Sequence, residues 1–157
     1  MYALRVIVMV VLLGIAGPLT AQTAPVTVAK SDKCPVCGMF VAKYPDFVAQ
    51  VIFTDGTYAV FDGAKDMFKY YFNLGKYNPA KRPADIAFVY VTDYYSMQLV
   101  DGRTASYVVG SDVFGPMGRE LIPFGQEKEA QLFMKDHAGK KMIRFEAVTP
   151  ELLKELD

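Results

Sequence analysis

The feature that most restricts the fold of this chain is a pattern of short strands and one helix that occurs twice. In the first copy, two β-rich runs at 47–53 and 57–61 flank Thr54-Asp55-Gly56, a tight-turn signal. Asp62 is the expected N-cap of a helix that follows, and Gly75 is its expected C-terminal stop. Apolar residues recur at helical spacing on one face of this helix, namely Ala64, Met67, Phe68, Tyr71 and Phe72. A third strand is expected at 86–92. The order strand, strand, helix, strand is therefore predicted for this half.

The second half of the chain shows the same order. The expected elements are strands at 104–109, 119–124 and 141–148 and a helix at 126–138, with a further edge strand at 97–100. A strand pair cannot bury its apolar face alone, so two such units should share a core. The sequence thus predicts an α+β fold in which two similar ββαβ units, 34–95 and 96–150, pack as one compact domain. Residues 151–157 are expected as a C-terminal tail.

The N-terminal residues are expected to leave the mature protein. Arg5 precedes an apolar run from Val6 to Ile15, and Leu19-Thr20-Ala21 resembles a signal-peptidase site, which predicts a secretory signal peptide over 1–21. The run is short for a transmembrane helix, which needs about 20 apolar residues. An uncleaved anchor is the alternative, and only in that form is membrane contact expected. Residues 22–33 are predicted as a linker in an exported protein.

Charge and cysteine content exclude several classes of protein. The 17 basic and 17 acidic side chains cancel, so no bulk field is available to hold nucleic acid. One histidine and two cysteines are too few for a four-cysteine zinc site or a multi-disulfide scaffold. The chain also has no Gly-rich phosphate loop and no serine-histidine pair at an elbow. An enzyme is therefore not expected.

The strongest chemical signal is the run Cys34-Pro35-Val36-Cys37-Gly38-Met39. Two residues between the cysteines let both sulfurs face one point, which suits a disulfide or a metal ion equally. Gly38 allows the backbone to fold back, and the thioether of Met39 completes a soft ligand set that selects Cu(I) over Mg, Ca or Mn. A structural disulfide between Cys34 and Cys37 is the plain alternative. A thioredoxin-like catalytic motif should open a helix that follows a strand, whereas this run precedes a strand and has only a linker before it. A thioredoxin-like role is therefore not expected.

Met117 is the second candidate ligand. The first copy turns in three residues, whereas the second has a long loop at 110–118 in which Pro116 and Gly118 flank Met117. Inserted loops on a rigid scaffold often hold binding residues. The alternative is a hydrophobic plug at the end of the sheet, since methionine fills irregular gaps.

The remaining candidates have ordinary explanations. His137 falls one residue from the end of the second helix, where a lone histidine more often caps the helix C-terminus than binds metal. Met97 and Met142 are expected in strands as packing residues. Aspartates at element ends, Asp62 among them, are expected to act as caps.

Together, the Cys34-to-Met39 run, the strand pair ending Val60-Phe61-Asp62, the strand at 89–93 and the Gly115-Pro-Met117-Gly118 loop resemble the NosL family of nitrous-oxide-reductase accessory proteins. The resemblance covers about 34–148. It implies a periplasmic Cu(I) chaperone that delivers copper for assembly of the reductase, with the apo enzyme and its membrane maturation machinery as partners. It also implies a distant likeness to part of the organomercurial lyase fold.

Carried over by residue, Cys37 and Met39 match the family's cysteine-x-methionine core, Cys34 its partner cysteine and Met117 its loop methionine. These four residues are the Cu(I) ligands that the resemblance implies. Two departures stand out. Ala21-Gln22 offers no cysteine for a lipid anchor, and Tyr44-Pro45 stands where many members carry histidine before proline.

Two other functions remain open at this point. The resemblance implies that the chain delivers copper to nitrous oxide reductase or a similar copper enzyme. It could instead be a thiol-disulfide reductant that keeps the copper-ligand cysteines of a client protein reduced. That alternative predicts a low thiolate pKa at Cys34. An interaction domain with a structural disulfide is the third possibility.

Overall fold

The computed structural model describes residues 24–157, and the expected signal peptide at 1–21 lies outside the described residues. The larger strands are β1 (Ala49–Phe53), β2 (Tyr58–Phe61), β3 (Ile86–Thr92), β4 (Leu99–Asp101), β5 (Ser106–Val109), β8 (Ile122–Phe124) and β9 (Lys141–Arg144). A small hairpin is made of β6 (Phe114–Gly115) and β7 (Gly118–Arg119). The helices are α1 (Ala64–Phe72), α2 (Leu74–Tyr77), α3 (Glu127–Asp136) and α4 (Pro150–Glu155), with short 3-10 turns at Val41–Lys43, Pro45–Phe47, Pro83–Asp85 and Phe145–Ala147.

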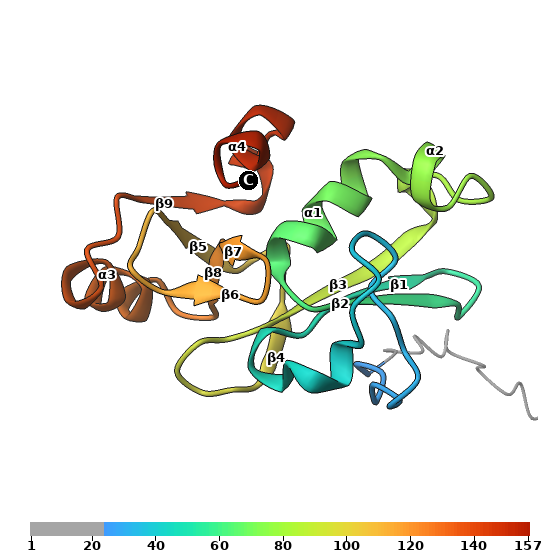
Figure 1. Ribbon diagram of the computed structural model, residues 1–157, viewed down its shortest axis with the longest axis horizontal. Helices are drawn as coiled ribbons and strands as arrows, with labels where there is room; N and C mark the ends of the chain where they lie inside the picture. Colours follow the sequence, from blue (N-terminus) through green and yellow to red (C-terminus); the bar gives the residue numbers. More distant parts are fainter. Residues whose placement is uncertain (1–23) are drawn as a thin grey trace, which may run out of the picture.

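The strands form two main antiparallel sheets. The first has the order β2-β1-β3-β4 and the second the order β8-β5-β9. In both sheets the first strand in the sequence lies at the centre, its hairpin partner on one side and the strand after the helix on the other. Figure 1 shows the two sheets at opposite ends of the molecule, with α1 beside the first. The small mixed α/β domain that the sequence predicts is therefore confirmed.

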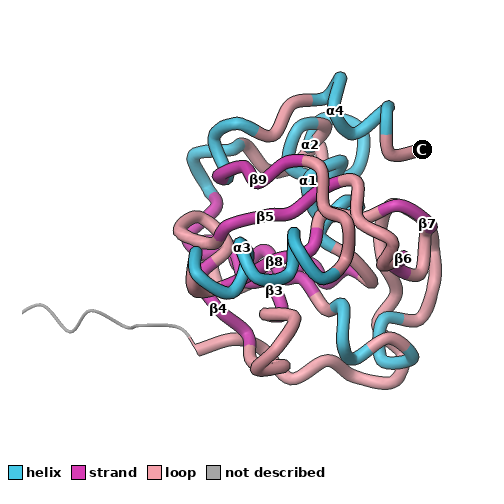
Figure 2. The backbone as a smooth tube through the Cα atoms, turned by 90° about the vertical axis from the view of Figure 1, so that its left-hand side faces the viewer, coloured by secondary structure: helices cyan, strands magenta, loops and turns pink. Residues whose placement is uncertain are grey.

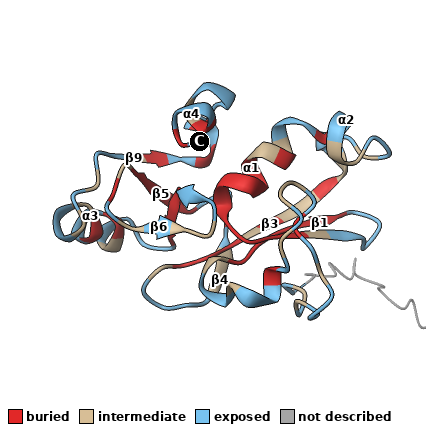
Figure 3. Cartoon of the chain, in the orientation of Figure 1, coloured by how far each residue is buried: buried red, intermediate tan, exposed pale blue. Residues whose placement is uncertain are grey.

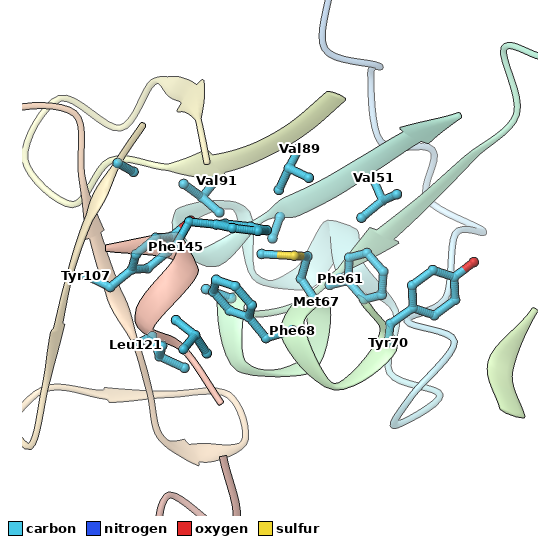
Figure 4. Packing of buried hydrophobic residues seen from close by; sticks show 14 of the residues in the cluster. Val51, Phe61, Met67, Phe68, Tyr70, Val89, Val91, Tyr107, Leu121 and Phe145 are labelled. Atoms are coloured by element: carbon cyan, nitrogen blue, oxygen red, sulfur yellow. The ribbon is translucent and has the colours of Figure 1, made fainter. Parts of the chain in front are cut away.

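One apolar core joins the two halves. Phe68 on α1 lies 5.2 Å from the ring of Tyr107 on β5 and 4.9 Å from that of Phe145, while the same helix packs Met67 against the first sheet. Figure 4 shows these side chains meeting between the sheets. The N-terminal part of α1 is accordingly buried, as Figure 3 shows. Neither half therefore has a complete core of its own.

A second, smaller cluster lies under α3. Phe133 and Ala130 face Phe124 and Ile122 of β8, and α3 covers one face of the second sheet (Figure 2). Pro123 is tolerated in β8 because that strand is at the sheet edge, where a missing N–H costs no ladder bond.

Both ends of the described chain pack onto the domain. In the segment 24–33, the backbone of Val26 exchanges two hydrogen bonds with the buried side chain of Gln50 on β1, at 2.9 and 2.8 Å. At the other end, α4 packs on α1 and buries Leu153 and Leu156. No helix within residues 24–157 is long and apolar enough to cross a membrane.

Several expected element boundaries were wrong. The edge strand predicted at 97–100 begins at Leu99, because Met97 has a φ of 55° in the turn before it and is 51% exposed. The closing strand predicted at 141–148 ends at Arg144, where the chain turns so that Phe145 enters the core. Gly75 does not end the first helix, which stops at Phe72 and is followed by a further helical turn.

The shared core makes a stability prediction. Phe68→Ala should lower the free energy of unfolding by about 3–5 kcal/mol, because a fully buried ring at the junction of both halves is lost and leaves a cavity. Urea unfolding followed by circular dichroism measures this change. Phe72→Ala on the same helix is the control: that ring is 37% exposed, so its loss should cost about 1 kcal/mol. Equal losses for the two variants would contradict the packing described.

Candidate metal centre

The cysteine motif forms a closed loop. Lys33 and Phe40 pair as an isolated antiparallel bridge, and inside it the Cys34 N–H donates to the Met39 carbonyl at 2.9 Å. The N–H of Gly38 donates to the Cys34 carbonyl at 2.9 Å, and the φ of Gly38 is 80°. The left-handed backbone that this turn requires is strained for residues other than glycine. In Figure 1 this blue loop reaches toward α1.

The loop brings both sulfurs against two carboxylates. The thiol of Cys34 donates to Asp66 Oδ2 at 3.4 Å, and the thiol of Cys37 donates to Asp62 Oδ1 at 3.2 Å. One potential ligand atom from each of these four residues lies within 4.8 Å of the other three. Cys34, Asp62 and Asp66 are buried, whereas Cys37 is partly exposed. Access to the cluster is therefore from the side of Cys37.

Two oxygens of this cluster lack a hydrogen-bond partner. Among the described residues, Asp62 Oδ2 and Asp66 Oδ1 are buried and accept no hydrogen bond. The ammonium group of Lys69 lies 4.0 Å from Asp66 Oδ1, which is an ion pair but not a hydrogen bond. A buried polar atom without a partner costs about 1–3 kcal/mol, and more when it is charged. In native proteins such an atom is explained by local strain, by a redox or catalytic role, or by a bound water or ion.

Asp62 belongs to this cluster because another residue caps α1. The sequence predicted Asp62 as the N-cap, and this was wrong: the N-cap is Gly63, which has no side chain for capping. Glu120 provides the carboxylate instead, with Oε1 accepting from the Lys65 N–H at 2.6 Å and from the Leu121 N–H at 2.9 Å. A Cβ at position 63 would lie 2.2 Å from Glu120 Oε2, so glycine is needed for this approach.

The environment keeps both thiols protonated. Burial raises the pKa of Cys34 far above its ordinary range and raises the pKa of Cys37 to about 11. Neighbouring carboxylates contribute to both shifts, because they stabilise the S–H form and repel a thiolate, while backbone N–H groups of the loop oppose the shift. The reductant alternative predicts a low pKa at Cys34, and the structure gives the opposite direction. Both cysteines are free thiols.

The two predicted methionines lie at different places. Met39 is part of the cysteine loop, and its sulfur accepts a hydrogen bond from the Tyr44 hydroxyl at 3.6 Å. Met117 lies in the turn between β6 and β7 with its side chain 42% exposed. Its carbonyl accepts a hydrogen bond from the Lys65 ammonium at 2.8 Å, which holds its loop against the helix that carries Asp66.

His137 is not part of the cluster. It is the C-cap residue of α3, its Nδ1 lies 3.0 Å from Asp112 Oδ1, and its ring stacks on Phe133 at 4.5 Å. It therefore lies at the end of α3, which covers the second sheet, in the C-cap position that the sequence indicated.

Sequence reasoning missed Asp62 and Asp66 as site residues. Their spacing of four across the start of a helix was the available signal, because it directs both carboxylates to one side. This signal was overlooked because Asp62 was interpreted as a helix cap.

The comparisons with known proteins agree on one family. The sequence model of the NosL family matches residues 25–153. The copper-binding lipoprotein NosL of Stutzerimonas stutzeri is 31% identical over 139 residues, an alignment that covers 83% of this chain and 69% of that protein.

A solved structure extends the comparison to the fold. The crystal structure of the copper chaperone NosL from Shewanella denitrificans matches with a TM-score of 0.68 at 23% identity, over 82% of this chain and 97% of that chain. At this identity the likeness shows a common fold.

The raised thiol pKa values predict slow alkylation. At pH 8 the thiolate fraction of Cys37 should be about 100-fold below that of a cysteine thiol with the ordinary pKa of 9.0. The more basic thiolate is about tenfold more nucleophilic, which offsets part of this difference. The rate with iodoacetamide should therefore be about tenfold lower in folded than in guanidinium-unfolded protein. Cys34 should react more slowly still. Mass spectrometry of quenched anaerobic samples measures both rates. A Cys34 that reacts faster in the folded state would support the reductant alternative.

Proposed function

The chain belongs to the NosL family, and from this premise we propose that it is an exported chaperone that binds one Cu(I) ion at Cys34 and Cys37 and transfers it to a copper enzyme during assembly. Copper is the cargo of such a protein, and no catalytic turnover is involved. The observation that carries the proposal is a dithiol, with Cys34 buried and Cys37 partly exposed, next to two buried carboxylate oxygens that have no hydrogen-bond partner among the described residues.

The ligand types favour the cuprous ion. Two thiolates from one loop, with the thioether of Met39 two residues after Cys37, form a soft set that suits Cu(I) better than a hard cation. The Tyr44 hydrogen bond to the Met39 sulfur uses one of its lone pairs and leaves the other free for a metal. We propose Cys34, Cys37, Met39 and Met117 as the ligands.

The two carboxylates are the nearest groups that can accept the thiol protons. Binding of Cu(I) must displace the thiol protons, because the thiolate is the ligand. Asp62 and Asp66 already accept these S–H groups, so they are the nearest acceptors for the protons. A Cu(I) dithiolate forms only when both thiol protons have left the sulfurs, so Cu(I) binding is expected to release protons to solvent. Cu(I) affinity should accordingly increase with pH.

A transfer function fits a site with mixed ligand strength. Thioethers are neutral and bind Cu(I) less tightly than thiolates, so Met117 can hold the ion without making its release slow. The side chain of Met117 is exposed, which places it where an acceptor protein could reach it.

The compartment and client complete the proposal. The apolar run at 6–15 and the Ala21 site support export to the periplasm, and the Stutzerimonas relative is itself named a lipoprotein. We propose nitrous oxide reductase, or a similar copper enzyme, as the client, with its membrane maturation machinery as a further partner. These assignments rest on family membership.

We also infer that the two halves are copies of one ββαβ unit. The strand after each helix pairs with the central strand in both sheets, which supports this relation. The β6–β7 hairpin then corresponds to an enlargement of the β1–β2 turn. The likeness to part of the organomercurial lyase fold stays a prediction.

Anaerobic titration of the reduced protein against a chromophoric Cu(I) chelator tests the function. We expect one Cu(I) per chain, a loss of competition in Cys34→Ser and Cys37→Ser, and a loss of affinity of about tenfold in Met117→Leu, equivalent to about 1.4 kcal/mol. Met117→Leu should change the free energy of unfolding by less than about 1.5 kcal/mol.

Met97→Leu is the matched control, since Met97 is also an exposed turn methionine but lies outside the proposed site. Its affinity should equal that of the unmodified protein. Binding near zero with both thiols free, or unchanged binding in Cys37→Ser, would refute the proposed site.

A further inference from the structure

Lys65 is a buried lysine whose charge is satisfied by segments far from it in sequence. Its side chain is 1% exposed, and its ammonium donates to the Met117 carbonyl at 2.8 Å and to the Leu156 carbonyl at 3.0 Å. The carboxylate of Asp157 lies 3.5 Å from it. Lysine is almost never fully buried unless it is paired, so these bonds fix its position. The lysine thus links α1, the β6–β7 turn and the C-terminus.

The backbone of the same residue holds the other end of the Met117 segment. The Lys65 N–H donates to Glu120, whose carboxylate is buried against Gly63. Residues 117–120 are therefore attached to one residue of α1 twice, through its side chain at Met117 and through its backbone at Glu120. Figure 1 shows the β6–β7 hairpin beside the N-terminal end of α1.

The hairpin is anchored at its base, where Val113 packs on the smaller apolar cluster and Leu121 is fully buried, but the hairpin itself is short. Its strands have two residues each and pair only Phe114 with Arg119 and Gly115 with Gly118. Two-stranded hairpins are marginal even when they are longer. Phe114 is 59% exposed and Met117 is 42% exposed, so the hairpin buries little apolar surface at these positions. The position of Met117 must therefore depend on the polar bonds to Lys65 and Glu120.

We propose that Lys65 and Glu120 are positioning residues of the metal site: they hold the β6–β7 turn on the end of α1 that carries Asp62 and Asp66, so that the Met117 thioether reaches Cu(I) at the dithiol. This inference rests on the proposed function. Lys65 lies directly before Asp66, and its backbone N–H belongs to the same first helical turn. The attachment thus makes a site from parts of both halves of the chain.

A double-mutant cycle tests the proposal. Lys65→Met keeps the aliphatic stem and removes the charge and all three donors. It should weaken Cu(I) binding by up to about tenfold, the loss expected for Met117→Leu itself and within the usual cost of losing a residue that orients a ligand. Adding Met117→Leu to Lys65→Met should then cause no further loss, because the thioether is already misplaced. Chelator competition measures all four affinities.

A second readout separates positioning from general stability. With the methionine methyl groups labelled with ¹³C, Cu(I) should shift the Met117 signal in the unmodified protein and leave it unshifted in Lys65→Met. Lys81→Met is the matched control, since Lys81 is a largely buried lysine that pairs with Asp55 at the β1–β2 turn. Its affinity and its Met117 shift should be those of the unmodified protein. If Lys65→Met does not fold, Lys65→Gln, which still has an amide donor, should give a smaller loss with the same non-additivity.

The outcomes separate the two levels of the proposal. A folded Lys65→Met with unchanged affinity and a normal Met117 shift, or losses that simply add with Met117→Leu, would overturn the positioning role alone. Failure of the unmodified protein to bind Cu(I) would overturn the proposed function and this inference together.

Discussion

Glu120 caps α1 by accepting from the N–H of Lys65, 55 residues earlier in the chain, and the rest of the site depends on that contact. The first N–H groups of an isolated helix have no partner, and a side chain just before the helix normally accepts from them. Here the residue at that place is Gly63, and a buried carboxylate from the other half of the chain takes the role. The contact joins the halves and leaves the neighbouring Asp62 free to face Cys37.

The proposed function requires a cluster that holds a metal ion without trapping it. Two neutral thiols lie against two carboxylates, and burial keeps the pKa of each thiol above its ordinary value. Copper must therefore compete with protons, so its affinity is lower than that of an already ionised dithiol. Low thiolate content also slows oxidation of the empty site, which the proposed export to an oxidising compartment would require. Both properties suit a carrier that must remain reduced and later release its ion.

Local patterns predicted the central elements of the fold. The alternating apolar residues of β1 and β3 and the helical spacing of Met67 and Phe68 indicate their elements without any long-range contact. The cysteine spacing and Gly38 predicted a closed loop, and the structure confirms it. The predicted strand position of Met97 and the predicted end of β9 were wrong, because the positive φ of Met97 and the turn of the chain into the core are set by tertiary packing.

The carboxylate half of the site could not be predicted in the same way. Asp62 before a helix has the local signature of a cap, and only Glu120, distant in sequence, shows that the role is already taken. Lys65 likewise has the pattern of a solvent-exposed lysine, and its burial becomes evident only when the Met117 turn and the C-terminus are in place. Contacts between distant segments, rather than propensities, build this part of the protein.

X-ray absorption at the copper edge of the reduced, loaded protein can decide whether the two cysteines and the methionines bind the ion, because it reports the atoms bound to copper. We expect cuprous copper bound by sulfur only, from both cysteines and the thioethers, and one sulfur fewer in Met117→Leu. A shell that contains oxygen or nitrogen from the carboxylates, or the same sulfur number in Met117→Leu, would contradict this expectation.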